Sequence, residues 1–108
     1  MGLFDIFSSN PTNPADKIKN EKEHNKRAVE RLQKDIELAQ KQIQKLKDDN
    51  TRLRKDKRGS KYVKPFIENN NRRIKDFQNK IKRRRDDIKR QKEQSKSRIE
   101  LIKIQSKQ

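Results

Sequence analysis

Cysteine and tryptophan are absent from this 108-residue chain, which also has only two glycines and one histidine. Without cysteine the chain can form neither a disulfide nor a thiolate zinc site, and His24 has no second histidine with which to share a metal ion. Two isolated glycines cannot form a glycine-rich phosphate loop. The sequence therefore predicts no metal, no cofactor and no small-molecule substrate, and we expect the protein not to be an enzyme.

Two pairs of adjacent carboxylates, Asp48-Asp49 and Asp86-Asp87, are the remaining candidates for acid–base or metal chemistry. Neighbouring side chains on a helix point about 100° apart, so neither pair converges on one atom. We expect these carboxylates, and His24, to be solvated surface groups.

Apolar residues are also scarce, since 26% of the chain is hydrophobic and 44% is charged. That is too little for a globular core, so the composition allows disorder or long helices that share a narrow interface. No apolar run approaches the roughly 20 residues of a membrane-spanning helix. The N-terminus also lacks the basic start and long apolar run of a signal peptide. We expect a protein that is neither secreted nor transmembrane, located in the cytoplasm or nucleoid or inside a viral particle.

What the chain does contain is a seven-residue repeat of isoleucine from residue 67 to residue 102, with Ser95 at the interrupted position. A heptad repeat indicates a helix that packs along a narrow interface, and a disordered chain has no reason to keep this period. The members of the repeat are Ile67, Ile74, Ile81, Ile88 and Ile102. The first half shows the same steps of three and four at Val29, Leu32, Ile36, Ala39, Ile43, Leu46 and Leu53, with Ile18 in phase upstream.

Helix boundaries follow from the capping residues. Asn13 is a suitable N-cap and Pro14 suits the first helical position, so a first helix is predicted over 14–58. Gly59 can take the left-handed conformation that ends a helix. Pro65 belongs in the first turn of a second helix, which predicts a turn over 59–64 and a helix over 65–106.

The two predicted helices match each other in one antiparallel register, in which residue i meets residue 120 − i. Leu46 then meets Ile74, and the polar exceptions also pair, Asn50 with Asn70 and Asn25 with Ser95. Buried polar groups are least costly when they face each other. We therefore predict an all-α fold, a long antiparallel two-helix hairpin (coiled coil) with a short apolar N-terminal segment.

This register leaves some positions unmatched. It places Arg84 opposite Ile36 and Gln91 opposite Val29, where the long side chains can reach solvent. It allows Asp49 to reach Arg73, but it sets Asp35 against Asp87. The alternative is a parallel homodimer, which leaves Gly59 and Pro65 without a role, and higher assembly of hairpins stays open.

Positive charge is concentrated in the second half: residues 59–108 carry 17 basic and 6 acidic groups, and the whole chain has a net charge of +16. One face of the second helix repeats a lysine every seven residues, or about every 10.5 Å. Such a surface suits a phosphate backbone, to which proteins bind by displacing counterions rather than by reading bases. The predicted nucleic-acid-binding residues are Arg72, Arg73, Lys75, Lys80, Lys82, Arg83, Arg85, Lys89, Arg90, Lys96 and Lys103.

The N-terminal segment, residues 1–13, joins an apolar start to a linker rich in Pro, Asn and Ser. Gly2-Leu3-Phe4-Asp5-Ile6 resembles the opening of amphibian membrane-active peptides of the aurein type, although the lysine-rich continuation of those peptides is missing. The resemblance implies contact with a membrane interface. The apolar residues could equally pack on a partner protein or on their own chain near Ile99, Leu101 and Ile104. The predicted anchor residues are Leu3, Phe4, Ile6 and Phe7.

Three functional hypotheses follow. The first is a non-enzymatic protein that binds DNA or RNA through the phosphate backbone with little sequence preference. The second is a structural or assembly component of a large complex such as a viral particle, held by its apolar N-terminus to protein or membrane. The third is an adaptor at a membrane surface. A protein partner or a homo-oligomer is compatible with each of them.

Overall fold

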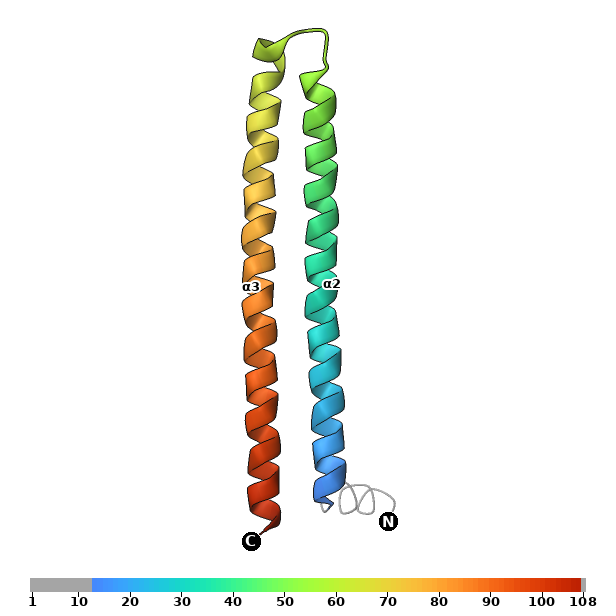
Figure 1. Cartoon of the computed structure of the whole chain (residues 1–108), viewed down its shortest axis with the longest axis vertical. Coiled ribbons are helices and arrows are strands. Elements are labelled where there is room, and N and C mark those ends of the chain that lie inside the picture. Colours follow the sequence, from blue (N-terminus) through green and yellow to red (C-terminus); the bar gives the residue numbers. More distant parts are fainter. Residues whose placement is uncertain (1–12, 108) are drawn as a thin grey trace, which may run out of the picture. The chain divides into compact units, whose positions relative to one another are not determined.

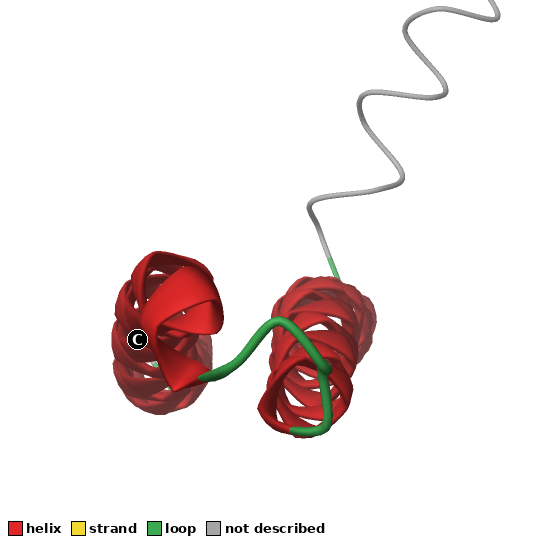
Figure 2. Ribbon diagram, turned by 90° about the horizontal axis from the view of Figure 1, so that it is seen from above, coloured by secondary structure: helices red, strands yellow, loops and turns green. Residues whose placement is uncertain are grey.

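The computed structural model describes residues 13–107 and contains two long helices, α2 (Pro14–Arg54) and α3 (Ser60–Ser106), joined by one loop (Figures 1 and 2). The described residues contain no strand. The predicted all-α helical hairpin is confirmed. The predicted apolar N-terminal segment lies outside the described residues.

The described chain divides into two compact units. Unit 1 combines α2 up to Arg31 with α3 from Asp87 onward, and unit 2 is the continuous stretch Leu32–Asp86, which includes the loop. In each unit a segment of α2 lies beside an antiparallel segment of α3 (Figure 1).

Helix α2 begins at the predicted cap. The Asn13 side-chain Oδ1 accepts a hydrogen bond of 2.9 Å from the Ala15 amide, and the Asn13 carbonyl accepts one of 3.1 Å from the Lys17 amide. The side-chain bond satisfies an amide that has no partner within the helix, and the carbonyl bond is the first backbone bond of the helix. Pro14 is the first residue of α2, as the sequence predicts.

The end of α2 and the start of α3 differ from the prediction. Helix α2 stops at Arg54 rather than at residue 58, and α3 starts at Ser60 rather than at residue 65. Gly59 has the expected positive φ, +96°, but it precedes α3 instead of ending α2. Its carbonyl accepts hydrogen bonds from the amides of Tyr62 and Val63 at 3.2 and 3.3 Å.

Pro65 therefore lies inside α3, where it offers no amide to the Lys61 carbonyl four residues before it. Lys61 is exposed, so water can solvate this carbonyl. The early start of α3 buries Val63 to 3% exposure. Burying a valine stabilises by roughly 1.5–3 kcal/mol, which offsets the roughly 1 kcal/mol of one missing hydrogen bond.

The core of unit 2 follows the predicted heptad positions of both helices. Its buried cluster is flanked by the partly buried Ile36 and Phe77. The cluster consists of Ala39, Ile43, Leu46, Ile74 and Ile81. The predicted pairs across the two helices, such as Leu46 with Ile74, belong to this one cluster.

Unit 1 has a thinner core. Val29 is buried from α2 and Ser95 from α3, whereas Ile18, Ile99 and Ile102 are only half-buried. Fewer buried apolar groups mean less stabilisation per residue. We expect unit 1 to open more readily than unit 2.

Polar contacts across the helices confirm the antiparallel register. In unit 2, Asn70 donates to Asn50 at 2.9 Å, and Arg84 pairs with Asp35 at 3.3 Å. The carboxylates flanking the interface also have partners: Asp35 pairs with Arg84, and Asp49 accepts from Asn70 at 2.8 Å and pairs with Arg52 at 3.5 Å.

In unit 1 the corresponding contact joins Arg98 to Glu21 at 3.1 Å. Residue numbers in these cross-helix pairs sum to 119 or 120, as the register requires. No helix in the described part of the chain is both long and apolar enough to cross a membrane.

Candidate nucleic-acid interface

The basic residues predicted on the second helix are carried by α3, and both units contribute some of them. Residues at these positions point away from the apolar interface because they fall between its heptad positions. All except Lys80 are exposed, and Lys80 is half-buried. Those in unit 2 are Arg72, Arg73, Lys75, Lys80, Lys82, Arg83 and Arg85. Those in unit 1 are Lys89, Arg90, Lys96 and Lys103.

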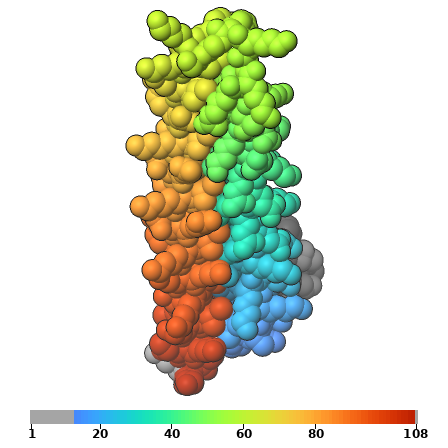
Figure 3. All heavy atoms as spheres, turned by 45° about the horizontal axis from the view of Figure 1, so that its top comes forward, coloured from blue at the N-terminus to red at the C-terminus, as the bar shows by residue number. Residues whose placement is uncertain are grey.

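The lysines at seven-residue spacing, which we call the lysine row, are Lys75 and Lys82 in unit 2 and Lys89, Lys96 and Lys103 in unit 1. All five are exposed. Long side chains project from the face of α3 seen in the space-filling view, and no deep cleft crosses that face (Figure 3).

Few of these cations are neutralised by the protein itself. Arg90 pairs with Asp87 at 3.0 Å, one turn away. None of the other ten predicted residues forms an ion pair with any residue in 13–107. Their ammonium and guanidinium groups are therefore available to an external anion.

The carboxylates do not converge on a common site. Asp48 accepts a bond from Gln44 on its own helix, whereas Asp49 accepts from Asn70 across the helix pair. His24 is exposed. No group of three or more His, Asp or Glu side chains in the described range could hold a metal ion.

Sequence reasoning missed a polar and aromatic cluster at the loop. The Arg58 guanidinium donates to Asp56 Oδ1 and Oδ2 at 3.0 and 2.8 Å, and the Arg58 amide also donates to Oδ1 at 2.9 Å. These bonds to Arg58, led by the side-chain one, lower the pKa of Asp56 from 3.8 to about 2. The signal that was available is the spacing Asp-x-Arg, in which an Asp side chain can bond the amide two residues later.

Arg58 also contacts Tyr62, the first aromatic residue of α3. Its guanidinium carbon lies 4.0 Å from the centre of the Tyr62 ring, and its Nη1 donates to the Tyr62 hydroxyl at 2.7 Å. The Phe66 ring is 5.7 Å from that of Tyr62, and both side chains are about half exposed. The aromatics thus gather near the loop and are not interleaved with the lysine row.

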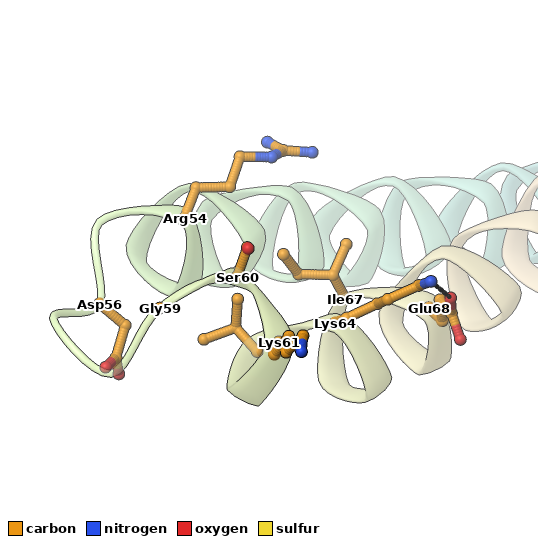
Figure 4. A pocket seen from close by; sticks show the side chains of 9 residues that line it. Arg54, Asp56, Gly59, Ser60, Lys61, Lys64, Ile67 and Glu68 are labelled. Carbon is orange, nitrogen blue, oxygen red and sulfur yellow. Dashed lines mark ion pairs between the residues drawn. The ribbon is translucent and has the colours of Figure 1, made fainter.

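A shallow depression of about 390 Å³ lies at the loop end of unit 2 (Figure 4). Val63 and Ile67 provide its apolar part, and Arg54 from α2 and Lys64 from α3 border it. Lys64 reaches toward Glu68 at 4.0 Å. No unpaired polar group is buried here, so this depression carries no ligand chemistry of its own.

The predicted anchor residues Leu3, Phe4, Ile6 and Phe7 lie outside the described residues, so their prediction stays a prediction. In comparisons with known proteins, no family model, curated protein or solved structure matched this chain.

Proposed function

We propose that this protein binds nucleic acid through the phosphate backbone, using the basic surface of α3, with little preference for sequence. The observation that carries the proposal is the exposed lysine row, none of whose members pairs with a carboxylate of the described residues. Within each unit, a spacing of about 10.5 Å between successive lysines places positive charges at regular intervals along α3. Phosphates that meet such a line release their condensed counterions, and this release supplies the affinity.

Sequence preference is expected to be weak because the surface has no group placed to read base edges. Arg and Lys contacts to phosphates position a protein on a duplex but do not specify bases. Stacking on single-stranded bases needs aromatic side chains among the cations. Tyr62 and Phe66 lie near the loop, before the basic positions begin at Arg72. Double-stranded DNA or RNA is therefore the favoured polymer.

The test compares two variants with the same loss of charge. In the first, Lys82, Arg83, Lys89 and Arg90 of α3 are replaced by glutamine. In the second, four exposed basic residues of α2 are replaced by glutamine: Arg31, Lys34, Lys41 and Lys45. Affinity for a random-sequence duplex is measured for both by fluorescence anisotropy.

We expect the α3 variant to lose much more affinity than the α2 variant, because the proposal places the phosphates on α3. Equal losses would mean that only the net charge matters, and the assignment to α3 would fall. Circular dichroism checks that both variants keep the helical content of the unmodified protein.

The second candidate is an assembly component of a larger complex, and exposed apolar side chains favour it. Tyr62 and Phe66 near the loop are 44% and 50% exposed, and Leu101 and Ile104 in unit 1 are 54% and 57% exposed. Exposed apolar groups are typical of surfaces that bind protein. If Tyr62→Ser with Phe66→Ser abolishes copurification with a protein partner, and free duplex does not bind, this candidate is favoured over the first.

A further inference from the structure

Two aromatic residues, Tyr62 and Phe66, are exposed at the start of α3 and lie four residues apart. Residues at this spacing share one face of a helix. The aliphatic residues that follow each of them, Val63 and Ile67, are buried and half-buried, so the interface with α2 is filled without the rings. Tyr62 and Phe66 remain 44% and 50% exposed. Folding therefore leaves this aromatic pair available to a ligand.

Arg58 adds a flat cationic group to the aromatic pair. Its guanidinium donates to the Asp56 carboxylate at 3.0 and 2.8 Å and to the Tyr62 hydroxyl at 2.7 Å. The guanidinium carbon lies 4.0 Å from the centre of the Tyr62 ring, yet the Arg58 side chain is 61% exposed. Since one face of the guanidinium is against the ring, its other face is open to solvent. A guanidinium held in this way loses little conformational freedom when a ligand stacks on it.

Positive charge surrounds the aromatic pair. Residues 52–64 carry 7 basic groups and 1 acidic group, and the whole stretch belongs to unit 2. The exposed basic residues of this stretch that form no ion pair with residues 13–107 are Arg54, Lys55, Lys57 and Lys61. The loop end of unit 2 thus offers planar groups for stacking and free cations for an anionic chain.

This combination favours a nucleic acid over a protein as the partner. Protein interfaces also contain aromatic residues and arginine, but lysine is depleted from them, since its ammonium group is strongly hydrated. A nucleobase stacks on aromatic rings and on guanidinium planes, while its phosphates meet the surrounding cations. Bases inside a duplex are already stacked on both sides. An unpaired base is therefore the group that fits.

We propose that Arg58, Tyr62 and Phe66 form a stacking surface that binds an unpaired base of a single-stranded nucleic acid. The inference goes beyond the proposed function, which concerns duplex phosphates on the basic surface of α3. Phe66 precedes Arg72, the first of the predicted basic positions, by about 9 Å along the helix. Both residues belong to unit 2, so a duplex with a single-stranded overhang can contact both surfaces at once.

The first experiment uses the ring protons of Tyr62, which is the sole tyrosine of the chain. The full-length protein is titrated with a short single-stranded DNA of mixed sequence and, separately, with the blunt duplex of the same length, and ¹H NMR follows the ring. The ring current of a stacked base moves these resonances upfield. We expect a saturable upfield shift with the single strand and a much smaller one with the duplex. No saturable shift with the single strand would overturn the proposal.

The second experiment removes both rings. Tyr62→Leu with Phe66→Leu keeps apolar, helix-forming side chains but no planar group, so affinity for the single strand should fall about tenfold, as expected for the loss of one stacked base. Affinity for the blunt duplex should not change. The matched control is Leu101→Ala with Ile104→Ala, which shortens two exposed apolar side chains in unit 1 and should change neither affinity. Equal losses for single strand and duplex, or equal losses in the two paired variants, would contradict a stacking surface.

Two single substitutions separate the contributions of the planar groups. Arg58→Lys keeps the charge but removes the guanidinium plane, so single-strand affinity should fall while duplex affinity stays constant. Tyr62→Phe removes the hydroxyl that Arg58 contacts but keeps the ring, and single-strand affinity should be retained. Circular dichroism checks that each variant keeps its helical content. An unchanged single-strand affinity of Arg58→Lys would contradict the role assigned to Arg58.

The outcomes for the two polymers distinguish this inference from the proposed function. If the duplex binds but the single strand does not shift the Tyr62 ring, the stacking surface falls and the backbone proposal stands. If the single strand shifts the ring but the duplex does not bind, the backbone proposal falls and the stacking surface stands. If neither polymer binds and Tyr62→Leu with Phe66→Leu releases a copurifying protein, the aromatic pair belongs to a protein interface and both proposals fall.

Discussion

The amides of Asn50 and Asn70 form a buried polar layer between the two helices of unit 2. They are 3% and 6% exposed, and Asn70 Nδ2 donates to Asn50 Oδ1 at 2.9 Å. Asn50 in turn donates to Asn71 at 3.0 Å, and Asn70 donates to Asp49 at 2.8 Å. A shift of one heptad would set Asn50 against Val63 or Phe77, and Asn70 against Ile43 or Lys57. The layer therefore favours one register over its neighbours.

Replacing one member of this layer should cost more than replacing both. Asn50→Ala removes one of the two cross-helix acceptors of Asn70 and leaves Asp49 as the other, and a stability loss of about 1–3 kcal/mol is expected. Asn50→Leu with Asn70→Leu should recover most of that loss, since no buried amide of the pair is then left unmatched. Urea unfolding measures both. A double variant as unstable as the single one would show that the amides themselves stabilise the interface.

The ionisation of Asp56 should make the free energy of unfolding depend on pH under acidic conditions. Its pKa is lowered from its ordinary value of 3.8 to about 2 in the folded protein, mainly by the bonds from Arg58. Because the folded pKa is the lower one, its contribution is complete above about pH 4 and is lost as the pH falls toward 2.

The measurement compares unfolding of the unmodified protein with that of Asp56→Ala between pH 2 and pH 6. We expect a constant difference in stability above about pH 4 that shrinks toward pH 2. A difference that does not change over this range would mean that the Asp56–Arg58 contact does not form in solution.

The loop between the helices depends on the conformation of one residue, Gly59. Its φ of +96° lies in a region that residues with a Cβ rarely adopt, but an added Cβ would meet no atom within 4 Å. The penalty for replacing Gly59 therefore comes from the backbone alone.

Gly59→Ala is expected to destabilise the hairpin by roughly 1–2 kcal/mol. Gly59→Asn should cost less, because asparagine tolerates a positive φ better, and Gly59→Val should cost most. Thermal unfolding ranks the three variants. Equal effects of alanine, asparagine and valine would contradict a conformational cause.

At the scale of the helix, the sequence predicted the pairing of the helices better than their ends near the loop. The apolar heptads and the Asn50–Asn70 match specify the register, because a polar residue at the interface is costly unless its partner is polar. The N-cap at Asn13 was also predicted correctly from the sequence. The start of α3 was predicted wrongly. Pro65 is a residue typical of a first helical turn, but the burial of Val63 favours a helix that starts earlier, at Ser60.

The basic surface could be predicted because a heptad position fixes which face a side chain occupies. Its exposure is confirmed at ten of eleven positions, with Lys80 half-buried. A depression of about 320 Å³ that Ser95 borders in unit 1 was not predicted, although the interruption of the isoleucine repeat was visible in the sequence. Whether a missing isoleucine leaves a space depends on how the neighbouring side chains relax, and a sequence pattern does not contain that information.

Over the whole molecule, the net charge of +16 should oppose folding through self-repulsion. Both units are positive, since residues 32–86 carry 19 basic and 8 acidic groups and the described part of unit 1 carries 13 and 7. At 0.1 M salt the Debye length is about 10 Å, so repulsion between exposed charges that lie farther apart than this is largely screened.

The thermal midpoint is therefore expected to rise as sodium chloride increases from low to moderate concentration. Circular dichroism during heating measures it. A midpoint that falls with salt would mean that ion pairs such as Glu21–Arg98 outweigh the repulsion. A rising midpoint also ensures that weaker nucleic-acid binding at higher salt is not caused by unfolding.

The central claim is that α3 binds phosphate backbones, and the salt dependence of duplex binding tests it most directly. Affinity of the unmodified protein is measured on two duplexes of unrelated sequence between 50 and 200 mM salt. Five lysine contacts predict a slope of log affinity against log salt of about −4 to −5, the same for both duplexes. An affinity that stays constant over this range, or that differs strongly between the two sequences, would contradict the account.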